Sequence, residues 1–183
     1  NLRAGNYSAA EEEHPYKRHR DELTKSFYLE QLEVLLPGQI VDWIDVGCAD
    51  GVKTRKLMEQ LELICTIRSL QAVDHSPQMV ETARKILGVD NVTQGDLSRL
   101  PYDQEFDLAT CLYSVINHLP EDRIEAGFAS LKQSLRPGGH LCTDIIGRDS
   151  EFFRRWGYEE GGANSGRFIA YNLVIQGEPI LDQ

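Results

Sequence analysis

Two glycines that close an apolar stretch are the first indication of a ligand site in this sequence. Residues 45–51 read DVGCADG; they follow the apolar residues 40–44 and lead into the segment VKTRKLM. A glycine-rich turn between a strand and a helix lets a ligand approach the backbone closely. The spacing is not the G-x-G-x-x-G of dinucleotide-binding proteins, and no Gly-Lys-Ser/Thr follows to hold a phosphate. The turn therefore favours a ligand without a phosphate group.

Two aspartates follow later apolar stretches and have side chains suited to a nucleoside. Asp74 comes 23 residues after Gly51, at the end of the expected strand 69–73, where a carboxylate can accept hydrogen bonds from both ribose hydroxyl groups. The alternative is a turn or helix-cap aspartate, because Ser76 follows. Asp96 follows the expected strand 91–93 and could accept from an exocyclic amine, although such an aspartate is also typical of an Asx turn.

The elements that would position these residues alternate along the chain. A helical pattern over 21–36 ends at Pro37-Gly38. Strands are then expected at 40–46, 69–73, 91–93, 106–112 and 140–146, with helices at 52–63, from Ser76-Pro77 to Gly88, and from Pro120 to the Pro137-Gly138-Gly139 run. This order predicts an α/β fold, a doubly wound, mostly parallel sheet with helices on both faces. In such sheets ligands bind beyond the carboxyl ends of the strands.

The composition of the chain limits the kinds of molecule that it is expected to bind. The 183 residues suit one domain with a sizeable core, and the net charge of −10 lacks the basic footprint of a nucleic-acid-binding protein. No run is long and apolar enough to span a membrane. The four cysteines form no CxxC pair, which predicts free core thiols and a reducing, cytoplasmic location. The chain has no initiator Met, which suggests that it begins inside a longer one.

Five segments in this order resemble the class I S-adenosylmethionine-dependent methyltransferases. They read DVGCADG, VDHSPQMVETAR, QGDLSRLPY, FDLATCLYSVINHLP and LKQSLRPGGHL, and they extend over roughly residues 40–146. No single motif is specific, but five in register are strong together. The resemblance implies a seven-stranded sheet whose last strand is antiparallel, S-adenosylmethionine as cofactor, and no metal ion. Ala49 stands where glycine is commoner in that family, and its small side chain should still leave room for the cofactor.

The resemblance also assigns residues to the cofactor. Residues 45–51 and the backbone of Leu112 would line its methionine part. Asp74 would hold the ribose hydroxyl groups, and His75 would pack beside the adenine. Asp96 would accept from the adenine amine while the next backbone unit contacts the ring. The predicted cofactor-binding set is Asp45, Gly47, Cys48, Ala49, Gly51, Asp74, His75, Asp96, Leu97 and Leu112.

Residues 111–119, CLYSVINHL, resemble the small-molecule N-methyltransferases of the glycine and amino-sugar type, as do residues 143–146 and 152–157. This resemblance implies a small amine as the methyl acceptor. The alternatives that stay open are O-methylation of a small hydroxylated metabolite and a domain that binds S-adenosylmethionine without catalysis. A nicotinamide-dependent oxidoreductase is disfavoured by the glycine spacing and by the Gly95-Asp96 pair.

Two residues after the fourth expected strand are candidates for catalysis. His118 could act as a base for a hydroxyl acceptor, whereas a neutral amine needs none. The alternative is a structural histidine at the start of the next helix. Tyr113 would line the acceptor pocket with Asn117, and Tyr113 or His140 would be the next candidate base.

Three regions are expected: a helical cap (1–39), the cofactor-binding domain (40–147), and a helix with a β-hairpin (148–183). The hairpin would be an insertion that covers the substrate, with the last elements of the fold beyond Gln183; alternatively, it forms the terminal strands. Tyr7, Tyr16 and Arg20 could close over the cofactor, although exposed surface is the commoner role. The expected assembly is a monomer or a homodimer.

Overall fold

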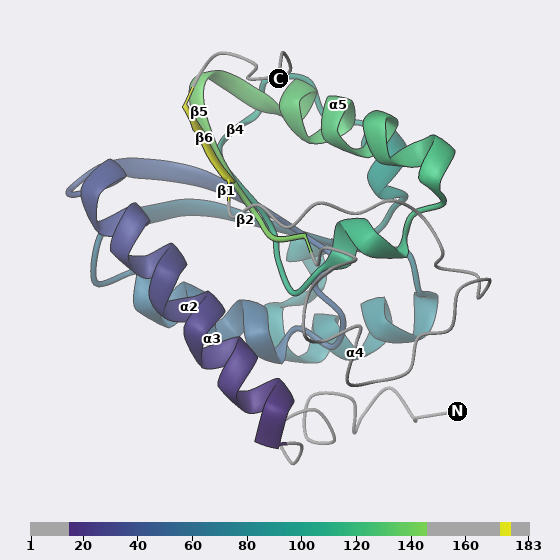
Figure 1. Cartoon of the computed structure of the whole chain (residues 1–183), viewed down its shortest axis with the longest axis horizontal. Helices are drawn as coiled ribbons and strands as arrows, with labels where there is room; N and C mark the ends of the chain where they lie inside the picture. The colour runs from purple at the N-terminus through teal and green to yellow at the C-terminus, as the bar shows by residue number, and fades with distance from the viewer. Residues whose placement is uncertain (1–14, 146–172, 177–183) are drawn as a thin grey trace.

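Six strands form a single sheet in the computed structural model, which describes residues 15–145 and 173–176 (Figure 1). The strand order is β3-β2-β1-β4-β5-β6, and every neighbouring pair is parallel except β5 and β6. The strands are β1 (Ile40–Val46), β2 (Thr66–Asp74), β3 (Val92–Gln94), β4 (Phe106–Cys111), β5 (Leu135–Thr143) and β6 (Leu173–Gln176). The predicted doubly wound sheet is confirmed.

Helices cover both faces of this sheet. The longer helices are α2 (Pro15–Leu35), α3 (Val52–Leu61), α4 (Pro77–Leu87) and α5 (Ile124–Ser134). Figure 1 shows α2, α3 and α4 below the sheet and α5 above it. Short 3-10 turns are η2 (Val89–Asn91), η3 (Leu97–Arg99), η4 (Val115–His118) and η5 (Glu121–Arg123).

The core explains why the strand sequences are apolar without alternation. Trp43 packs with the buried residues of α2 and α3, whereas its neighbour Ile44 packs with Leu131 of α5 on the other face. In β1, residues 41–46 are therefore buried whichever way they point, as expected for a central strand of a parallel sheet covered on both sides.

β5 begins earlier than the sequence indicates. The helix expected to run to Pro137-Gly138-Gly139 ends at Ser134, and β5 starts directly at Leu135, which pairs with Phe106. The next pair joins Leu108 to His140, so residues 136–139 lie opposite Asp107 alone as a bulge. The Pro-Gly-Gly run interrupts a strand here instead of preceding one.

The four cysteines are buried and free, as predicted. Burial raises the pKa of each thiol, to about 12 for Cys142, so the thiols stay protonated and behave as small apolar groups. No helix in the described part of the chain combines the length and apolar character needed to cross a bilayer.

Most of the predicted helix and hairpin at 148–183 lies outside the described residues. The described piece, β6, pairs antiparallel with β5, from His140 with Gln176 to Thr143 with Leu173. Tyr7 also lies outside the described residues, and Tyr16 and Arg20 are described only as part of the backbone of α2.

Candidate active site

The glycine turn lies at the carboxyl end of β1, between β2 and β4. Gly47 has φ +84° and Gly51 has φ +83°, values that favour glycine. The amides of Gly47 and Cys48 donate to the carbonyl of Val73 at 2.7 and 3.1 Å. A Cβ added at Gly47 would lie 2.4 Å from Cγ2 of Val115, which leaves no room for a side chain. The turn is thus pressed against the segment that follows β4.

Ala49 adopts a left-handed conformation, with φ +49°. For a residue other than glycine this costs about 1–2 kcal/mol. Its amide donates to Oδ2 of Asp74 at 2.9 Å, and this bond offsets part of the cost. Ala49 therefore has a glycine-like backbone, at the position where glycine is commoner in the family that the sequence resembles.

Asp45 is buried at the end of β1 and binds two threonines. Thr54 of α3 donates to Oδ2 at 2.5 Å, and Thr110 of β4 donates to Oδ1 at 2.6 Å. Trp43 in turn donates to Thr110 at 2.8 Å. Burial raises the pKa of Asp45 above its ordinary value despite the two hydroxyl donors, and the charge of Asp74 raises it further. Asp45 thus ties the turn to α3 and β4. The two threonines were not predicted, although a polar residue inside the apolar segment 106–112 is a signal for such a bond.

Asp74 ends β2 beside the turn and is 8% exposed. Besides the bond from Ala49, it accepts the Ser76 amide at 2.9 Å on Oδ1. His75 is exposed, with Nδ1 3.6 Å from the same oxygen. Asp74 therefore does make the local turn contacts considered as its alternative role. A carboxylate has about four acceptor positions, so these bonds leave capacity for hydroxyl groups of a ligand.

Asp96 begins η3 and accepts from the amide and hydroxyl of Ser98 at 3.0 and 2.8 Å. Arg99 and Arg123 each lie 3.3 Å from its other oxygen. The bonds from Ser98 are the main reason that the pKa of Asp96 lies below its ordinary value, and the two arginines lower it further. The Asx-turn role is therefore present; contact with an adenine amine stays a prediction. Leu97, the next residue, is buried.

The chain after β4 makes an unusual turn. Leu112 is buried, and the next two residues, Tyr113 and Ser114, have φ +63° and +64°. Consecutive left-handed residues other than glycine are costly and are found chiefly at functional sites. Nζ of Lys53 lies 3.9 Å from the centre of the Tyr113 ring.

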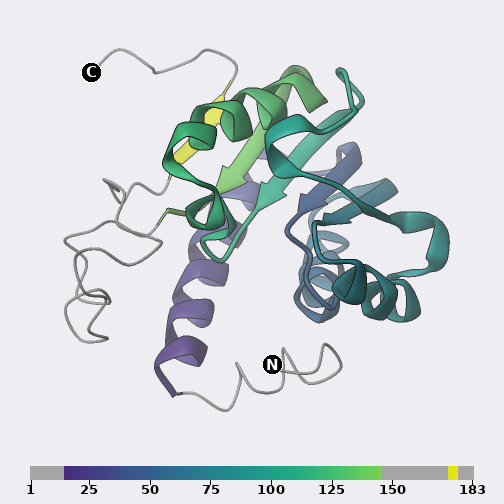
Figure 2. The same cartoon turned by 90° about the vertical axis from the view of Figure 1, so that its right-hand side faces the viewer.

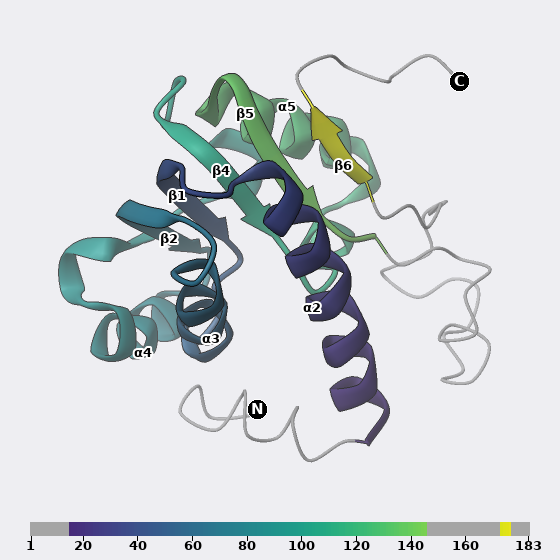
Figure 3. The same ribbon diagram turned by 90° about the vertical axis from the view of Figure 1, so that its left-hand side faces the viewer.

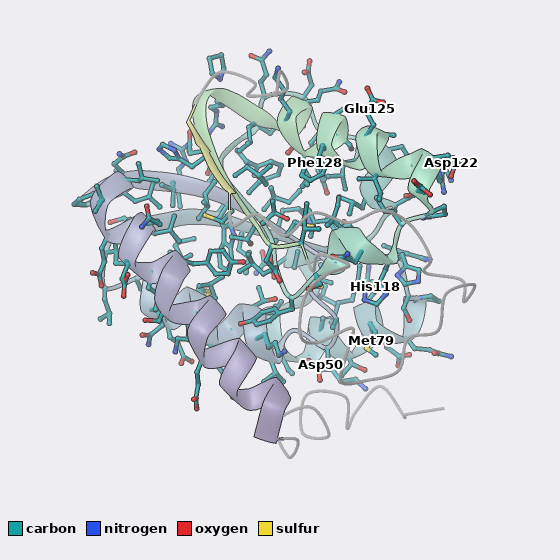
Figure 4. All side chains as sticks on the ribbon, in the orientation of Figure 1. Asp50, Met79, His118, Asp122, Glu125 and Phe128 are labelled. Atoms are coloured by element: carbon teal, nitrogen blue, oxygen red, sulfur yellow. The ribbon has the colours of Figure 1, made fainter. Side chains whose placement is uncertain are left out.

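His118 ends η4 and is exposed. Figure 4 shows it on the side of the molecule where Met79 and Asp50 lie, below the labelled residues of α5. The structure thus brings Tyr113 to the end of β4 and leaves His118 at the surface beyond it. His140, the other candidate base, lies within β5, away from this edge, and burial lowers its pKa.

A polar group next to Tyr113 was not predicted. Asp144 follows β5, is 8% exposed, and accepts from the Ser114 hydroxyl group at 3.1 Å. Tyr28 of α2 is also buried there, and burial, with the charge of Asp144, raises its pKa far above the ordinary value. Figures 2 and 3 show that the N-terminal half of α2 extends past the carboxyl ends of β4 and β5. The helix therefore forms one wall of this edge.

A family model described as a methyltransferase domain matches residues 44–139, from β1 into β5. The match covers more than half of the chain and includes the turn, Asp74, Asp96 and the segment after β4. The chain belongs to this methyltransferase family. The resemblance to class I S-adenosylmethionine-dependent methyltransferases is thereby confirmed; the glycine and amino-sugar subtype is not established.

Three known proteins illustrate what this chain is similar to. It is 32% identical over 114 residues to the mitochondrial ubiquinone biosynthesis O-methyltransferase of Schizosaccharomyces pombe, covering 57% of this chain and 38% of that protein. It is similar to the structure of a possible histamine N-methyltransferase from Thermotoga maritima, with TM-score 0.55 and 25% identity over 84% of this chain and 69% of the other. The third is the DhpI complex with S-adenosylhomocysteine, with TM-score 0.56 and 25% identity over 79% of this chain and 64% of that one. The chain therefore spans well under half the length of the Schizosaccharomyces pombe protein.

The residues of this chain fit the expected cofactor. S-adenosylmethionine has a nucleoside and a methionine part but no phosphate. Gly47 in the turn leaves no space for a side chain, the turn contains no lysine, and Asp74 beside it has acceptor capacity for ribose hydroxyl groups. Among the described residues, no group of three or more His, Cys, Asp or Glu side chains is arranged to hold a metal ion.

Proposed function

We propose that this chain transfers a methyl group from S-adenosylmethionine to a small-molecule amine. The observation that carries the proposal is the meeting of the glycine turn, Asp74 and the strained turn at Tyr113 along one edge of the sheet. The bound cofactor would supply a methyl group on a sulfonium, which is already activated for displacement. The chain's own task is then alignment, with the turn and Asp74 fixing one reactant and the residues after β4 facing the other.

The choice of an amine rests on residues 111–119, which resemble the small-molecule N-methyltransferases. The likeness to the Thermotoga structure, whose title names a possible histamine N-methyltransferase, agrees with this choice. A hydroxylated metabolite is the second candidate, because the Schizosaccharomyces pombe relative is named as an O-methyltransferase. We expect no nucleic-acid substrate, given the net charge of −10.

The proposal is tested by transfer of labelled methyl from S-adenosylmethionine to a panel of small amines and their hydroxyl analogues. Product from amines supports it, and product from hydroxyl compounds alone would favour the second candidate. Calorimetric titration with S-adenosylhomocysteine tests the cofactor separately. Binding without turnover on either panel would favour a domain that binds without catalysis.

Asp74→Ala should weaken binding of S-adenosylhomocysteine by about 1–3 kcal/mol, because the ribose hydroxyl groups would lose a charged acceptor. Because the Ala49 and Ser76 amides donate to different oxygens of Asp74, Asp74→Asn keeps an acceptor for only one of them. Urea denaturation of Asp74→Ala and Asp74→Asn therefore measures how far each change weakens the turn itself. Asp90→Ala, at an exposed position in η2, is the matched control. Unchanged affinity in the folded Asp74→Ala variant would remove this residue from the cofactor site.

His118→Ala distinguishes the two acceptor classes. With an amine acceptor we expect little change in turnover, because a neutral amine attacks without help from a base. With a hydroxyl acceptor the loss should be about 10²–10⁴-fold, since general-base catalysis contributes that much. Turnover of wild type and variant is compared across neutral pH. A large pH-dependent loss with an amine would show that His118 has a role that the amine mechanism does not require.

A further inference from the structure

Lys53 carries a positive charge beside the glycine turn of the candidate site. It lies in the first turn of α3, directly after the glycine turn, and its side chain is half-buried. Its Nζ atom lies 3.9 Å from the centre of the Tyr113 ring. The negative face of an aromatic ring attracts a cation. The ammonium group is therefore held near the end of β4 instead of extending into solvent.

The surroundings of the turn are strongly acidic. Asp45, Asp50 and Asp74 are 7%, 3% and 8% exposed, and all three lie in or beside the turn. The charge of Asp74 contributes to the raised pKa of Asp45, which shows that one negative charge here disfavours another. A ligand that brings a carboxylate to this turn would meet the same repulsion. The methionine part of S-adenosylmethionine carries such a carboxylate beside an ammonium group and the sulfonium. The acidic groups suit these two cations, whereas the carboxylate gains from a cation supplied by the protein.

We infer that Lys53 binds the carboxylate of the cofactor's methionine part, with Tyr113 holding the ammonium group in place. The inference rests on the proposed function and adds one residue, Lys53, to the side of the site where the methionine part is expected. Lys53 was not predicted, because a lysine near a glycine turn first suggests a phosphate ligand. The geometry assigns the residue to a carboxylate instead, through a contact that depends on the left-handed turn at Tyr113.

Two ligands separate this role from a structural one. S-adenosylhomocysteine carries the carboxylate, whereas 5′-methylthioadenosine keeps the nucleoside and the thioether but lacks the amino-acid part. In calorimetric titrations Lys53→Gln should weaken binding of S-adenosylhomocysteine by about 10-fold and leave that of 5′-methylthioadenosine within about 2-fold. Lys53→Arg should retain most of the affinity, because a guanidinium group keeps both the charge and the stacking on Tyr113.

Lys56→Gln is the matched control, because it removes the same charge from an exposed position on the same helix. It should leave the affinity for both ligands unchanged. Equal weakening of both ligands by Lys53→Gln would make Lys53 a support for the fold and overturn the inference, as would no weakening of either. If the wild-type protein binds neither ligand, the proposed function itself fails. If the wild type binds both ligands and Lys53→Gln binds them equally well, only the inference about Lys53 fails.

Discussion

Gly47→Ala is expected to lower the affinity for S-adenosylhomocysteine by about 100-fold, because displacing a positioned site by about 1 Å has effects of that size. It should also reduce the free energy of unfolding by about 2–4 kcal/mol. The left-handed backbone accounts for about 1–2 kcal/mol, and the overlap with Val115 adds the cost of an overpacked contact. Calorimetry and urea denaturation measure the two effects.

Gly38→Ala is the control for the backbone contribution. Gly38 also has a left-handed backbone, with φ +67°, but nothing lies within 4 Å of an added Cβ. This variant should lose only about 1–2 kcal/mol and keep its affinity. Adding Val115→Ala to Gly47→Ala removes both Cγ atoms from the overlap and should restore part of the stability. Equal effects of Gly47→Ala and Gly38→Ala would show that the close approach to Val115 does not constrain the turn.

Asp42→Asn should destabilise the fold by about 2–3 kcal/mol at neutral pH, because the bonds it loses are charge-assisted. Asp42 is buried on β1, where Arg68 makes two contacts with its carboxylate. Ser69 donates to it at 2.7 Å, and Arg136 of the β5 bulge lies 2.9 Å away. Since Arg136 also donates to Asp107 at 2.8 Å, the cluster joins β2, β1, β4 and β5 at the edge opposite the site.

The effect of Asp42→Asn should shrink in acid. The bonds from Arg68 hold the pKa of Asp42 well below its ordinary value of about 3.9. Below about pH 4 the unfolded chain takes up a proton at Asp42 while the native protein does not, so falling pH favours unfolding. The stabilisation is complete above that pH and is lost as the pH falls toward the native pKa.

Urea denaturation at several pH values between about 3 and 7 measures this dependence. Asp103→Asn, at an exposed position in the loop before β4, is the control and should change stability by less than about 0.5 kcal/mol. A difference between wild type and Asp42→Asn that stays constant down to pH 3 would contradict the pKa argument. Loss of affinity for S-adenosylhomocysteine without loss of stability would contradict the purely structural role.

The sequence predicted those parts of the fold that depend on local pattern. β1 was recognised because its residues are apolar on both sides, and α4 because Ser76 and Pro77 begin it. The start of β5 was missed because Leu135 joins the sheet through Phe106, a partner distant in the chain, before the Pro-Gly-Gly bulge. From the local sequence alone, the Pro-Gly-Gly run is interpreted as the end of the preceding helix.

The same division applies to the site. Asp74 could be placed because it ends a strand beside a glycine turn. The partners of Asp96 could not, because Arg123 comes from a segment after β4. The contact of Lys53 with Tyr113 depends on a left-handed backbone at a residue other than glycine, which composition does not indicate. The sequence identified the types of residue at the site, but it did not show which residues distant in the chain contact each other.

Because Trp43 is hydrogen-bonded to Thr110, its fluorescence should respond to changes at the site. The indole N–H is fixed to a hydroxyl group that itself donates to Asp45, so a change at the turn alters the polarity around a buried fluorophore. The sequence has two tryptophans, and replacing Trp156 by Phe would leave Trp43 as a single emitter. Its emission wavelength would then follow ligand occupancy in stopped-flow mixing, with no label attached, and would give the association rate of the cofactor before any methyl acceptor is known.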